Sequence, residues 1–395
     1  MSQLKQLFEN GADRCHTCSV KWDMIEKRGL PADVLPLWVA DMDFQTVPEV
    51  VDAVKKVAER GLWGYSFAGP DYYEAVIDFM QRRHQFTVEA DWIVQTPGVV
   101  AAINRSIEAF TEPGDPVLIL EPVYHPFRRS IETLGRRVVS VPLLEDDLRY
   151  TMDFAAIERA VIDNNINLMI FCSPHNPVGR VWTLEELGAL KDIIIDHDMR
   201  IVSDEIHHDL IMPGFKHHVF GAAYPELMDR LVTCTAPSKT FNLAGLAISN
   251  IIIADPEMRE QFKASIQRAS YPNPTPFSIA ACHAAYQYGD EWLDTCCEYI
   301  AEQSEALKKA LKEYELPIRV TPKQGMYLDW LDCRAISEDP EELDKLFLDE
   351  ARLWLNNGAV FGEEGRGFMR FNLACKKGVP EEAVKRLAAA LAERG

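Results

Sequence analysis

Five short apolar runs in the first two-thirds of the chain are each followed by a residue or turn that could take part in chemistry. The residues that follow these runs offer a glycine at the start of a helix, an aromatic ring, an amide, a carboxylate and an amine. In chain order they are Gly98, Tyr124, Asn176, Asp204 and Lys239. Ligands of open parallel α/β sheets bind beyond the carboxyl ends of the strands, so we expect these groups to meet in one crevice. A lysine amine can form a Schiff base with an aldehyde, and a carboxylate can keep a ring nitrogen protonated.

Together these groups are what pyridoxal phosphate requires. Its aldehyde needs a lysine, its ring nitrogen a carboxylate, and its phenolic oxygen a hydrogen-bond donor such as an amide. Its ring face stacks on an aromatic side chain, and its phosphate suits the N-terminus of a helix. The sequence therefore predicts that the crevice binds pyridoxal 5'-phosphate.

Strands and helices alternate from about residue 90 to residue 255. We expect strands at Asp91–Gln95, Val117–Leu120, Leu168–Cys172, Arg200–Ser203 and Leu231–Thr235. A helix is expected over Val99–Phe110, and Thr183 with Glu186 forms a capping box that opens another. Strands separated by crossover helices predict an α/β fold with a mostly parallel sheet covered on both faces.

The pattern changes after Asp290, where a long helical stretch to about Lys312 precedes mixed elements. Strands are expected at Ile318–Thr321, Met326–Leu331 and Phe368–Leu373, and helices at about 340–354 and 379–393. This mixture predicts a smaller α+β domain. We expect residues 1–45 to pack with the small domain, residues 46–290 to form the large cofactor-binding domain, and residues 291–395 to form the small domain.

The net charge and the distribution of apolar residues argue against some classes of binding partner. The 395 residues include 41 basic and 61 acidic ones, for a formal net charge of −20. Such a surface repels nucleic-acid phosphates and anionic lipids, which argues against both as partners. Met1–Asn10 lacks the apolar core of a signal peptide, and no run approaches the ~18 apolar residues of a membrane span. With nine scattered cysteines, interpreted as reduced thiols, the sequence predicts a cytoplasmic protein.

One cysteine pair has the spacing of a metal site. Cys15 and Cys18 form a C-x-x-C motif. No second C-x-x-C or H-x-H cluster supplies the remaining ligands of a zinc ion, so we expect no metal in this chain.

Six motifs in order along the chain carry a resemblance to a known family. They are PLWVADMDF at 36–44, GYS at 64–66, SPHNPVG at 173–179, SDEIH at 203–207, SKTFN at 238–242 and GEEGRGFMR at 362–370. On these motifs the chain resembles the fold-type I pyridoxal-phosphate enzymes of the class I/II aminotransferase superfamily. Within it, the chain is similar to the cystathionine β-lyase-type C–S lyase branch, which includes maltose-regulon modulator-like proteins. The resemblance runs essentially end to end and implies an aminotransferase-like fold with a seven-stranded sheet in the large domain.

The resemblance implies roles for the residues around the cofactor ring. Lys239 resembles the Schiff-base lysine and the base that removes the α-proton of the substrate, and Asp204 the partner of the ring nitrogen. Asn176 matches the donor to the phenolic oxygen, and Tyr124 the stacked aromatic ring. His207 either contacts that oxygen or is a packed histidine.

Further matches concern the phosphate and the second subunit. Gly98, Val99 and Val100 resemble the backbone that meets the phosphate, and Ser238 offers it a hydroxyl. Tyr65 matches a tyrosine that reaches the phosphate of the neighbouring subunit, which implies a homodimer with shared active sites. Tyr65 is also a candidate acid for the leaving sulfur. The family's usual arginine or lysine near the phosphate is replaced by Ala247, as in the lyase branch.

Two residues match the substrate side of the site. Arg370 resembles the arginine that holds the α-carboxylate of the substrate, since a guanidinium makes two parallel bonds to a carboxylate. Trp38 matches one edge of the substrate pocket, and a core tryptophan is the alternative.

The expected reaction is β-elimination from L-cystathionine or a related cysteine S-conjugate. It yields a thiol, homocysteine in the case of cystathionine, together with pyruvate and ammonia. An aminotransferase of amino acids is the first alternative, because both reactions begin by removing the α-proton. A regulatory pyridoxal-phosphate-binding protein with a protein partner is the second.

Overall fold

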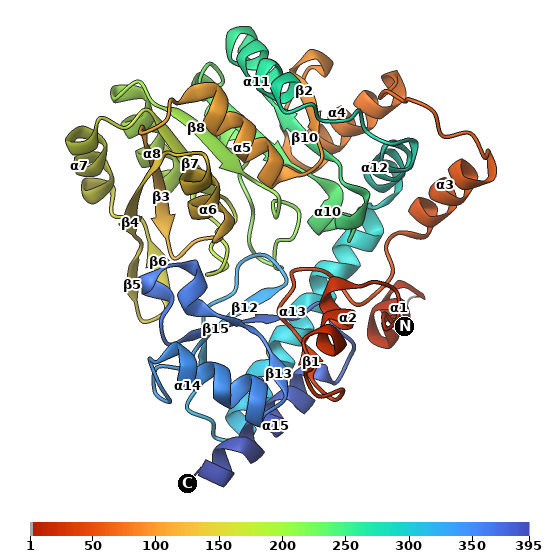
Figure 1. Cartoon of the computed structure of the whole chain (residues 1–395), viewed down its shortest axis with the longest axis vertical. Helices are drawn as coiled ribbons and strands as arrows, with labels where there is room; N and C mark the ends of the chain where they lie inside the picture. The colour runs from red at the N-terminus through yellow and green to blue at the C-terminus, as the bar shows by residue number, and fades with distance from the viewer. Residues whose placement is uncertain (1–2, 395) are drawn as a thin grey trace.

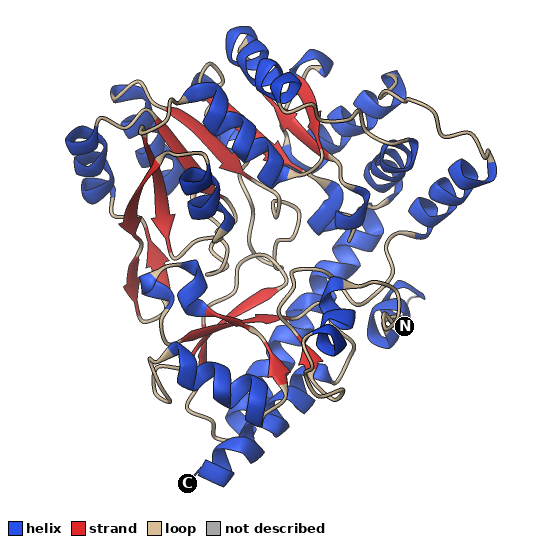
Figure 2. Ribbon diagram, viewed as in Figure 1, coloured by secondary structure: helices blue, strands red, loops and turns tan. Residues whose placement is uncertain are grey.

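A seven-stranded sheet forms the centre of the larger part of the molecule (Figures 1 and 2). The structure is a computed structural model that describes residues 3–394. In sheet order the strands are β2 (Ile93–Thr96), β10 (Ser249–Ile252), β9 (Leu231–Thr235), β8 (Arg200–Asp204), β7 (Leu168–Cys172), β3 (Pro116–Glu121) and β4 (Arg137–Pro142). Only β10 runs antiparallel to its neighbours, which confirms the mostly parallel sheet.

Helices cover both faces of this sheet, because successive strand residues point to opposite faces. Leu168 and Ile170 of β7 pack in one buried cluster, and Met169 and Phe171 pack in another. The first cluster includes residues of α5 (Val99–Phe110), α6 (Pro126–Thr133) and α11 (Pro256–Arg268). The second includes residues of α7 (Phe154–Asn164), α8 (Leu184–Asp196) and α9 (Phe220–Ala223). The expected helix over 99–110 and the α/β fold class are confirmed.

Local capping agrees with the sequence at α8. The Thr183 side chain accepts a hydrogen bond from the Glu186 backbone N–H, and the Glu186 carboxylate accepts one from the Thr183 N–H. This reciprocal pair satisfies two donors that the first helical turn would otherwise leave free. The predicted capping box is confirmed.

A smaller antiparallel sheet lies in the lower part of Figure 1. Its order is β11 (Arg319–Val320), β12 (Leu328–Asp332), β15 (Phe368–Asn372) and β14 (Asn356–Asn357). The 24-residue helix α13 (Asp290–Glu313) runs from the large part towards this sheet. Buried apolar side chains form one continuous cluster from α4 (Pro70–His84) and α12 (Pro276–Tyr288) through α13 to α15 (Val379–Arg394). α3 (Pro48–Glu59) packs beside α12.

The helix expected over 340–354 ends early, at Glu350. α14 (Pro340–Asp344) continues as a π-helical turn over Lys345–Glu350, and the chain then forms β13 (Leu353–Trp354). β13 pairs in parallel with β1 (Leu35–Pro36), so a partner far away in the sequence overrides the local helical pattern.

The N-terminal segment lies against the smaller part. It contributes α1 (Gln3–Asn10), α2 (Val20–Lys27) and β1, and the Asp43 backbone N–H donates to the Ala374 oxygen at 2.9 Å. The expected domain limits at residues 45 and 290 remain predictions. Met1, Ser2 and Gly395, at the ends of the expected first and last domains, lie outside the described residues.

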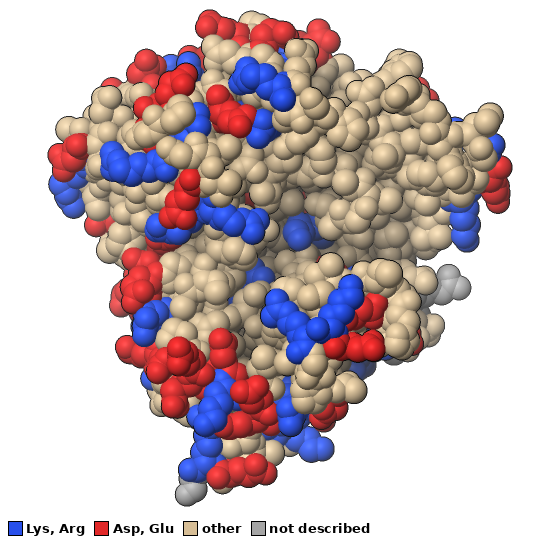
Figure 3. Space-filling view, viewed as in Figure 1, with Lys and Arg blue, Asp and Glu red and all other residues tan. Residues whose placement is uncertain are grey.

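The remaining elements are short. The hairpin of β5 (Leu144–Asp146) and β6 (Arg149–Thr151) extends beyond the large sheet, and α10 (Pro237–Thr240) follows β9. Across residues 3–394, none of the helices combines the length and apolar character that a membrane span needs. In Figure 3 acidic and basic side chains gather at the left, top and bottom of the face, whereas the upper right is largely free of them apart from its outer edge. Basic atoms are visible in a central hollow.

Candidate functional site

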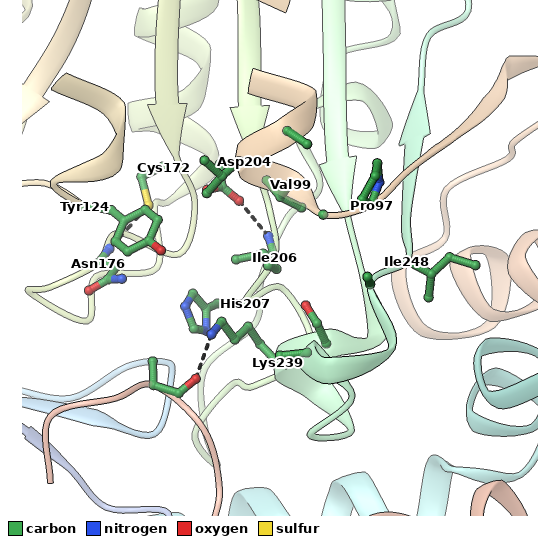
Figure 4. Close-up of a pocket in the computed structure, with 17 residues that line it drawn as sticks. Pro97, Val99, Tyr124, Cys172, Asn176, Asp204, Ile206, His207, Lys239 and Ile248 are labelled. Atoms are coloured by element: carbon green, nitrogen blue, oxygen red, sulfur yellow. Dashed lines mark hydrogen bonds between the residues drawn. The ribbon is translucent and has the colours of Figure 1, made fainter. Parts of the chain in front are cut away.

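A cavity of about 360 Å³ opens where β7, β8 and β9 end (Figure 4). It brings together nearly all the side chains and backbone that the sequence assigned to the cofactor. These are Gly98, Val99, Val100, Tyr124, Asn176, Asp204, His207, Ser238 and Lys239. Parallel strands place their carboxyl ends at one edge of the sheet, which explains why residues from five strands meet here.

Lys239 lies in α10 and is partly exposed to the cavity. Its Nζ donates a hydrogen bond to the backbone oxygen of Ala40 at 2.6 Å. The surrounding protein disfavours the ammonium and lowers the pKa of Lys239 to about 8, although Asp41 and Asp204 oppose this shift. About one amine in ten is therefore uncharged at pH 7.

Asp204 ends β8 and is buried. Its Oδ1 accepts the Ile206 backbone N–H at 3.1 Å. Burial raises the pKa of Asp204 to about 7, because the carboxylate has lost its water, and the charge of Lys239 only partly offsets this. A cation placed beside this carboxyl would restore its ionised form.

Arg370 projects from β15 and is buried against the large part of the molecule. Its Nη1 donates to Asn176 Oδ1 at 3.1 Å, and its Nη2 donates to Asn356 Oδ1 at 2.6 Å. Nη2 also donates to the Trp38 backbone oxygen at 3.1 Å, whereas the buried Nε has no hydrogen-bond partner. Burial lowers the pKa of Arg370 to about 10, so the guanidinium stays charged at neutral pH. Among the residues that the structure describes, no carboxylate pairs with this guanidinium, so its charge suits an anionic ligand.

Trp38 contributes its backbone rather than its ring to this group of residues. The indole stacks on Trp354, with ring centroids 4.4 Å apart and planes at 14°. The ring does not line the cavity, and it belongs to a small cluster between α2 and β13.

One end of the cavity is formed by the start of α5. Gly98 is the N-cap residue, in an extended conformation, and the space where a Cβ would stand is open. The first backbone N–H groups of a helix have no acceptors within the helix, and its dipole favours an anion. Ser238 and Ala247 also line the cavity, so no basic side chain stands at position 247.

His207 is buried at the cavity wall. Its Nδ1 has no hydrogen-bond partner, and its ring meets that of Tyr327 edge-on at 6.0 Å. Burial holds the pKa of His207 well below its usual range, so the imidazole is neutral. An unpartnered buried nitrogen at a cavity wall is available to a ligand.

The structure does not bring Tyr65 to the cavity of its own chain. Tyr65 is fully exposed, within a stretch that also exposes Leu62, Trp63 and Phe67. A cluster of exposed aromatic and aliphatic side chains of this kind is typical of a surface that another protein covers.

Sequence reasoning missed several residues of the site. Ala40 accepts from both Lys239 and the Tyr327 hydroxyl, the latter at 2.9 Å, and Asn356 contacts Arg370. Ala40 lies within the motif at 36–44 and could have been suspected. Tyr327 and Asn356 follow no recognisable signal, because their contacts with Ala40 and Arg370 depend on tertiary packing.

The whole chain matches known proteins. Residues 32–391 match the family described as aminotransferase class I and II. Cystathionine beta-lyase PatB of Bacillus subtilis is 40% identical over 97% of this chain and 99% of PatB. Protein MalY of Escherichia coli is 30% identical over 95% of this chain and 96% of MalY. The crystal structure of cystalysin from Treponema denticola, which contains pyridoxal 5'-phosphate, superposes with a TM-score of 0.95 at 39% identity, covering 98% of this chain and 99% of that one. The chain therefore belongs to the class I and II aminotransferase family.

Proposed function

We propose that this protein is a pyridoxal-phosphate-dependent C–S lyase that cleaves L-cystathionine or related cysteine S-conjugates. The proposal depends on one observation: Lys239 and Asp204 line the same cavity. It is supported by the 40% identity of the chain to a cystathionine β-lyase. One water is consumed, and the products are a thiol, pyruvate and ammonia.

The cavity suits the cofactor in size and in chemistry. A volume of about 360 Å³ lies in the range of small-molecule sites. We assign Lys239 to covalent attachment, Asp204 to the ring nitrogen, Asn176 to the phenolic oxygen and Tyr124 to the ring face. The unpartnered Nδ1 of His207 supports a contact with the same oxygen.

The phosphate end combines backbone and hydroxyl donors. We assign it to the N–H groups at Gly98, Val99 and Val100 and to the Ser238 hydroxyl. Ala247 gives no positive charge there. The dipole of α5 and a second subunit therefore have to stabilise the phosphate.

The chain's own residues bind the substrate and move its protons. Bound pyridoxal phosphate supplies an electron sink for the pair left when the α-proton is removed. Arg370 binds the α-carboxylate through two parallel hydrogen bonds, which replace those to Asn176 and Asn356. The Lys239 amine accepts the α-proton, and its pKa of about 8 makes it a base near neutral pH. Cleavage of the Cβ–S bond then releases the thiolate.

We infer a homodimer in which each active site is completed by Tyr65 of the partner. The exposure of Leu62, Trp63, Tyr65 and Phe67 supports this arrangement. The Tyr65 hydroxyl would then contact the phosphate and is the candidate proton donor to the leaving sulfur. Seven cysteines, buried as free thiols, support a reducing compartment such as the cytoplasm.

Product analysis of the holoenzyme tests the proposal. Incubation with L-cystathionine should release homocysteine, pyruvate and ammonia in equal amounts, and borohydride should fix the cofactor on the peptide that contains Lys239. Absence of pyruvate, with conversion of the cofactor to its amine form by an amino acid, would instead identify an aminotransferase. A cellular effect that survives Lys239→Ala would identify a regulatory protein.

A further inference from the structure

A second cavity of about 480 Å³ lies next to the first and shares no lining residue with it. His207 lines the first cavity, and the following residue, His208, lines the second. The walls of the second cavity come from the end of α4, from the chain after β8 and from α13. Three of its residues, His84, His208 and Asp209, are candidate ligands whose ligating atoms all lie within 4.8 Å of one another.

The spacing of these atoms is close to that of a coordination shell. His84 Nε2 lies 2.7 Å from Asp209 Oδ1, and His208 Nε2 lies 3.2 Å from the same oxygen. Ligands at ~2.0–2.1 Å from a tetrahedral zinc ion are roughly 3.3 Å apart. To admit the ion, the two contacts with Asp209 Oδ1 would have to lengthen by about 0.1–0.6 Å, and the two imidazole nitrogens, which lie within 4.8 Å of each other, would have to reach the same spacing.

The contact of His208 Nδ1 shows which ring nitrogen carries a proton. Nδ1 contacts the backbone oxygen of Glu205, which can only accept, so Nδ1 carries the hydrogen. Nε2 of this buried ring lies 3.2 Å from Asp209 Oδ1 without the geometry of a hydrogen bond. Burial opposes the imidazolium, yet the charge of Asp209 raises the pKa of His208. A divalent cation can replace the proton between Nε2 and the carboxylate, because metal and proton bind the same lone pair. A histidine that donates Nδ1–H to a backbone carbonyl and offers Nε2 has the usual arrangement of a metal ligand.

The surrounding groups hold this arrangement in place. Asp209 Oδ2 accepts from the Thr240 hydroxyl at 2.6 Å, so the carboxylate is oriented by the residue that follows Lys239. Glu205 accepts from His217 Nε2 at 2.8 Å, and this leaves His217 Nδ1 buried without a partner at the same cavity.

Charge at the cavity also favours a cation. Asp294 and Glu298 line it together with Asp209, and so do Arg83 and Lys216. Arg83 is already paired with Asp294 at 2.7 Å, which reduces its repulsion of an incoming ion.

We propose that His84, His208 and Asp209 bind a divalent transition-metal ion such as Zn²⁺, with a water from the cavity as the fourth ligand. Two imidazoles and a carboxylate suit such ions better than Mg²⁺ or Ca²⁺, which prefer oxygen ligands alone. The ion links the end of α4 to the chain after β8 and, through Asp209 and Thr240, to α10. It therefore braces the helix that carries Lys239 without touching the cofactor cavity.

Titration of the holoenzyme tests the site after dialysis against a chelator. Zn²⁺ should bind with about one ion per chain by calorimetry, and it should raise the temperature of thermal unfolding. Co²⁺ should give the visible absorption bands of a tetrahedral site, which are measured as a difference from the spectrum of the cofactor.

Substitutions locate the ion. His84→Gln and His208→Gln should each weaken Zn²⁺ binding at least about tenfold and reduce the thermal shift accordingly. His218→Gln is the matched control, because His218 is a histidine close in sequence that does not line the cavity. If one variant does not fold, the other still tests the site. Circular dichroism identifies a variant that is unfolded.

Three outcomes would overturn the proposal. One is the absence of Zn²⁺ uptake by the folded wild-type protein, which would identify His208 and Asp209 as a buried imidazolium–carboxylate pair. A second is binding that His84→Gln and His208→Gln leave unchanged, which would place the ion at the cofactor phosphate or on the surface. The third is equal weakening by His218→Gln.

Discussion

The side-chain amine of Lys239 donates to the backbone oxygen of Ala40, 2.6 Å away. The Tyr327 hydroxyl contacts the same oxygen, so one carbonyl joins α10 to the small sheet. The neighbouring Asn372 amide donates to the backbone oxygens of Val39 and Asp41 at 2.6 and 2.7 Å. The loop that carries Ala40 is thus fixed on both sides, and the position of the Lys239 amine depends on segments far from it in sequence.

Attachment of pyridoxal phosphate to the cofactor-free protein should become faster as the pH rises through about 8. Only the uncharged amine reacts with an aldehyde, and burial lowers the pKa of Lys239 to about 8. About one amine in ten is uncharged at pH 7 and about nine in ten at pH 9. Stopped-flow absorbance at several pH values measures the rate. A rate that keeps rising up to pH 10 would mean that the lysine has its ordinary pKa.

Asp204→Asn should lower activity while raising the stability of the cofactor-free protein. The Asn oxygen can still accept the Ile206 N–H, but no charge remains to keep a ring nitrogen protonated. We expect kcat to fall at least about 100-fold, since the electron sink is weakened.

The stability difference of Asp204→Asn should depend on pH. Burial raises the pKa of Asp204 from 3.8 to about 7, so the stabilisation by the protonated carboxyl is complete below pH 4 and is lost as the pH rises through 7. The free energy of unfolding of the variant should therefore exceed that of the wild type by up to about 4 kcal/mol at pH 8, and the two free energies should agree at pH 4. Urea unfolding at both pH values measures the difference. Equal stabilities at pH 8 would show that the carboxyl is hydrated.

Arg370→Lys should raise KM for cysteine conjugates about 10- to 100-fold. Lysine keeps the positive charge but cannot make two parallel bonds to a carboxylate. Loss of one charge-assisted hydrogen bond corresponds to about 1.5–3 kcal/mol. The matched control is Arg366→Lys, since Arg366 lies in the same motif and its side chain is 45% exposed. Steady-state kinetics of pyruvate release compares the two variants, and similar KM values would remove Arg370 from the substrate site.

Lys21→Met should destabilise the protein by about 3–5 kcal/mol. The Lys21 amine is completely buried and donates to Asp43 Oδ2 at 2.8 Å. Its removal takes away the cation nearest to this buried carboxylate and leaves Arg14, 3.5 Å from Oδ1, as the remaining positive charge. A further Asp43→Asn substitution should recover part of the loss. Lys55→Met, at an exposed lysine 3.8 Å from Asp52, should change stability by less than about 0.5 kcal/mol. Thermal unfolding measures all three variants, and a small loss in Lys21→Met would mean that the Asp43 charge is solvated.

Mixed dimers should recover activity that neither parent variant has. If each site takes Lys239 from one subunit and Tyr65 from the other, a dimer of Lys239→Ala and Tyr65→Ala chains contains one intact site. After subunit exchange in an equal mixture, about a quarter of wild-type activity should return, since half of the dimers are mixed. Activity that stays at the mean of the two parents would place Tyr65 and Lys239 in sites of the same chain.

The sequence predicted much of the large sheet and the centre of the cavity. Leu168–Cys172 and Leu231–Thr235 are strands with the expected bounds, because buried parallel strands are short continuous apolar runs. Asn176, Asp204 and Lys239 could be placed in one crevice, because the ends of such strands share an edge. β10 was missed since Ser249 and Asn250 interrupt its apolar run, although both side chains are buried there.

What the sequence could not supply are contacts between distant segments. The ring of Trp38 stacks on Trp354, more than 300 residues away, and not on a substrate edge. His84 and Asp209 are 125 positions apart, so the sequence does not indicate that they are close in space. The only spacing typical of a metal site in the sequence analysis was the C-x-x-C pair at Cys15 and Cys18. Tertiary packing determines each of these arrangements, and no periodicity or spacing records it.

His207 and His208 stand back to back, with one imidazole in each of two neighbouring chambers. A deletion or insertion of a single residue between Asp204 and this pair would shift both imidazoles by one position, away from the cavities that they now line, so the length of this stretch is as constrained as its composition. At this point a single segment of backbone separates the two cavities. A displacement of this segment by a ligand in one cavity would therefore also move a wall of the other.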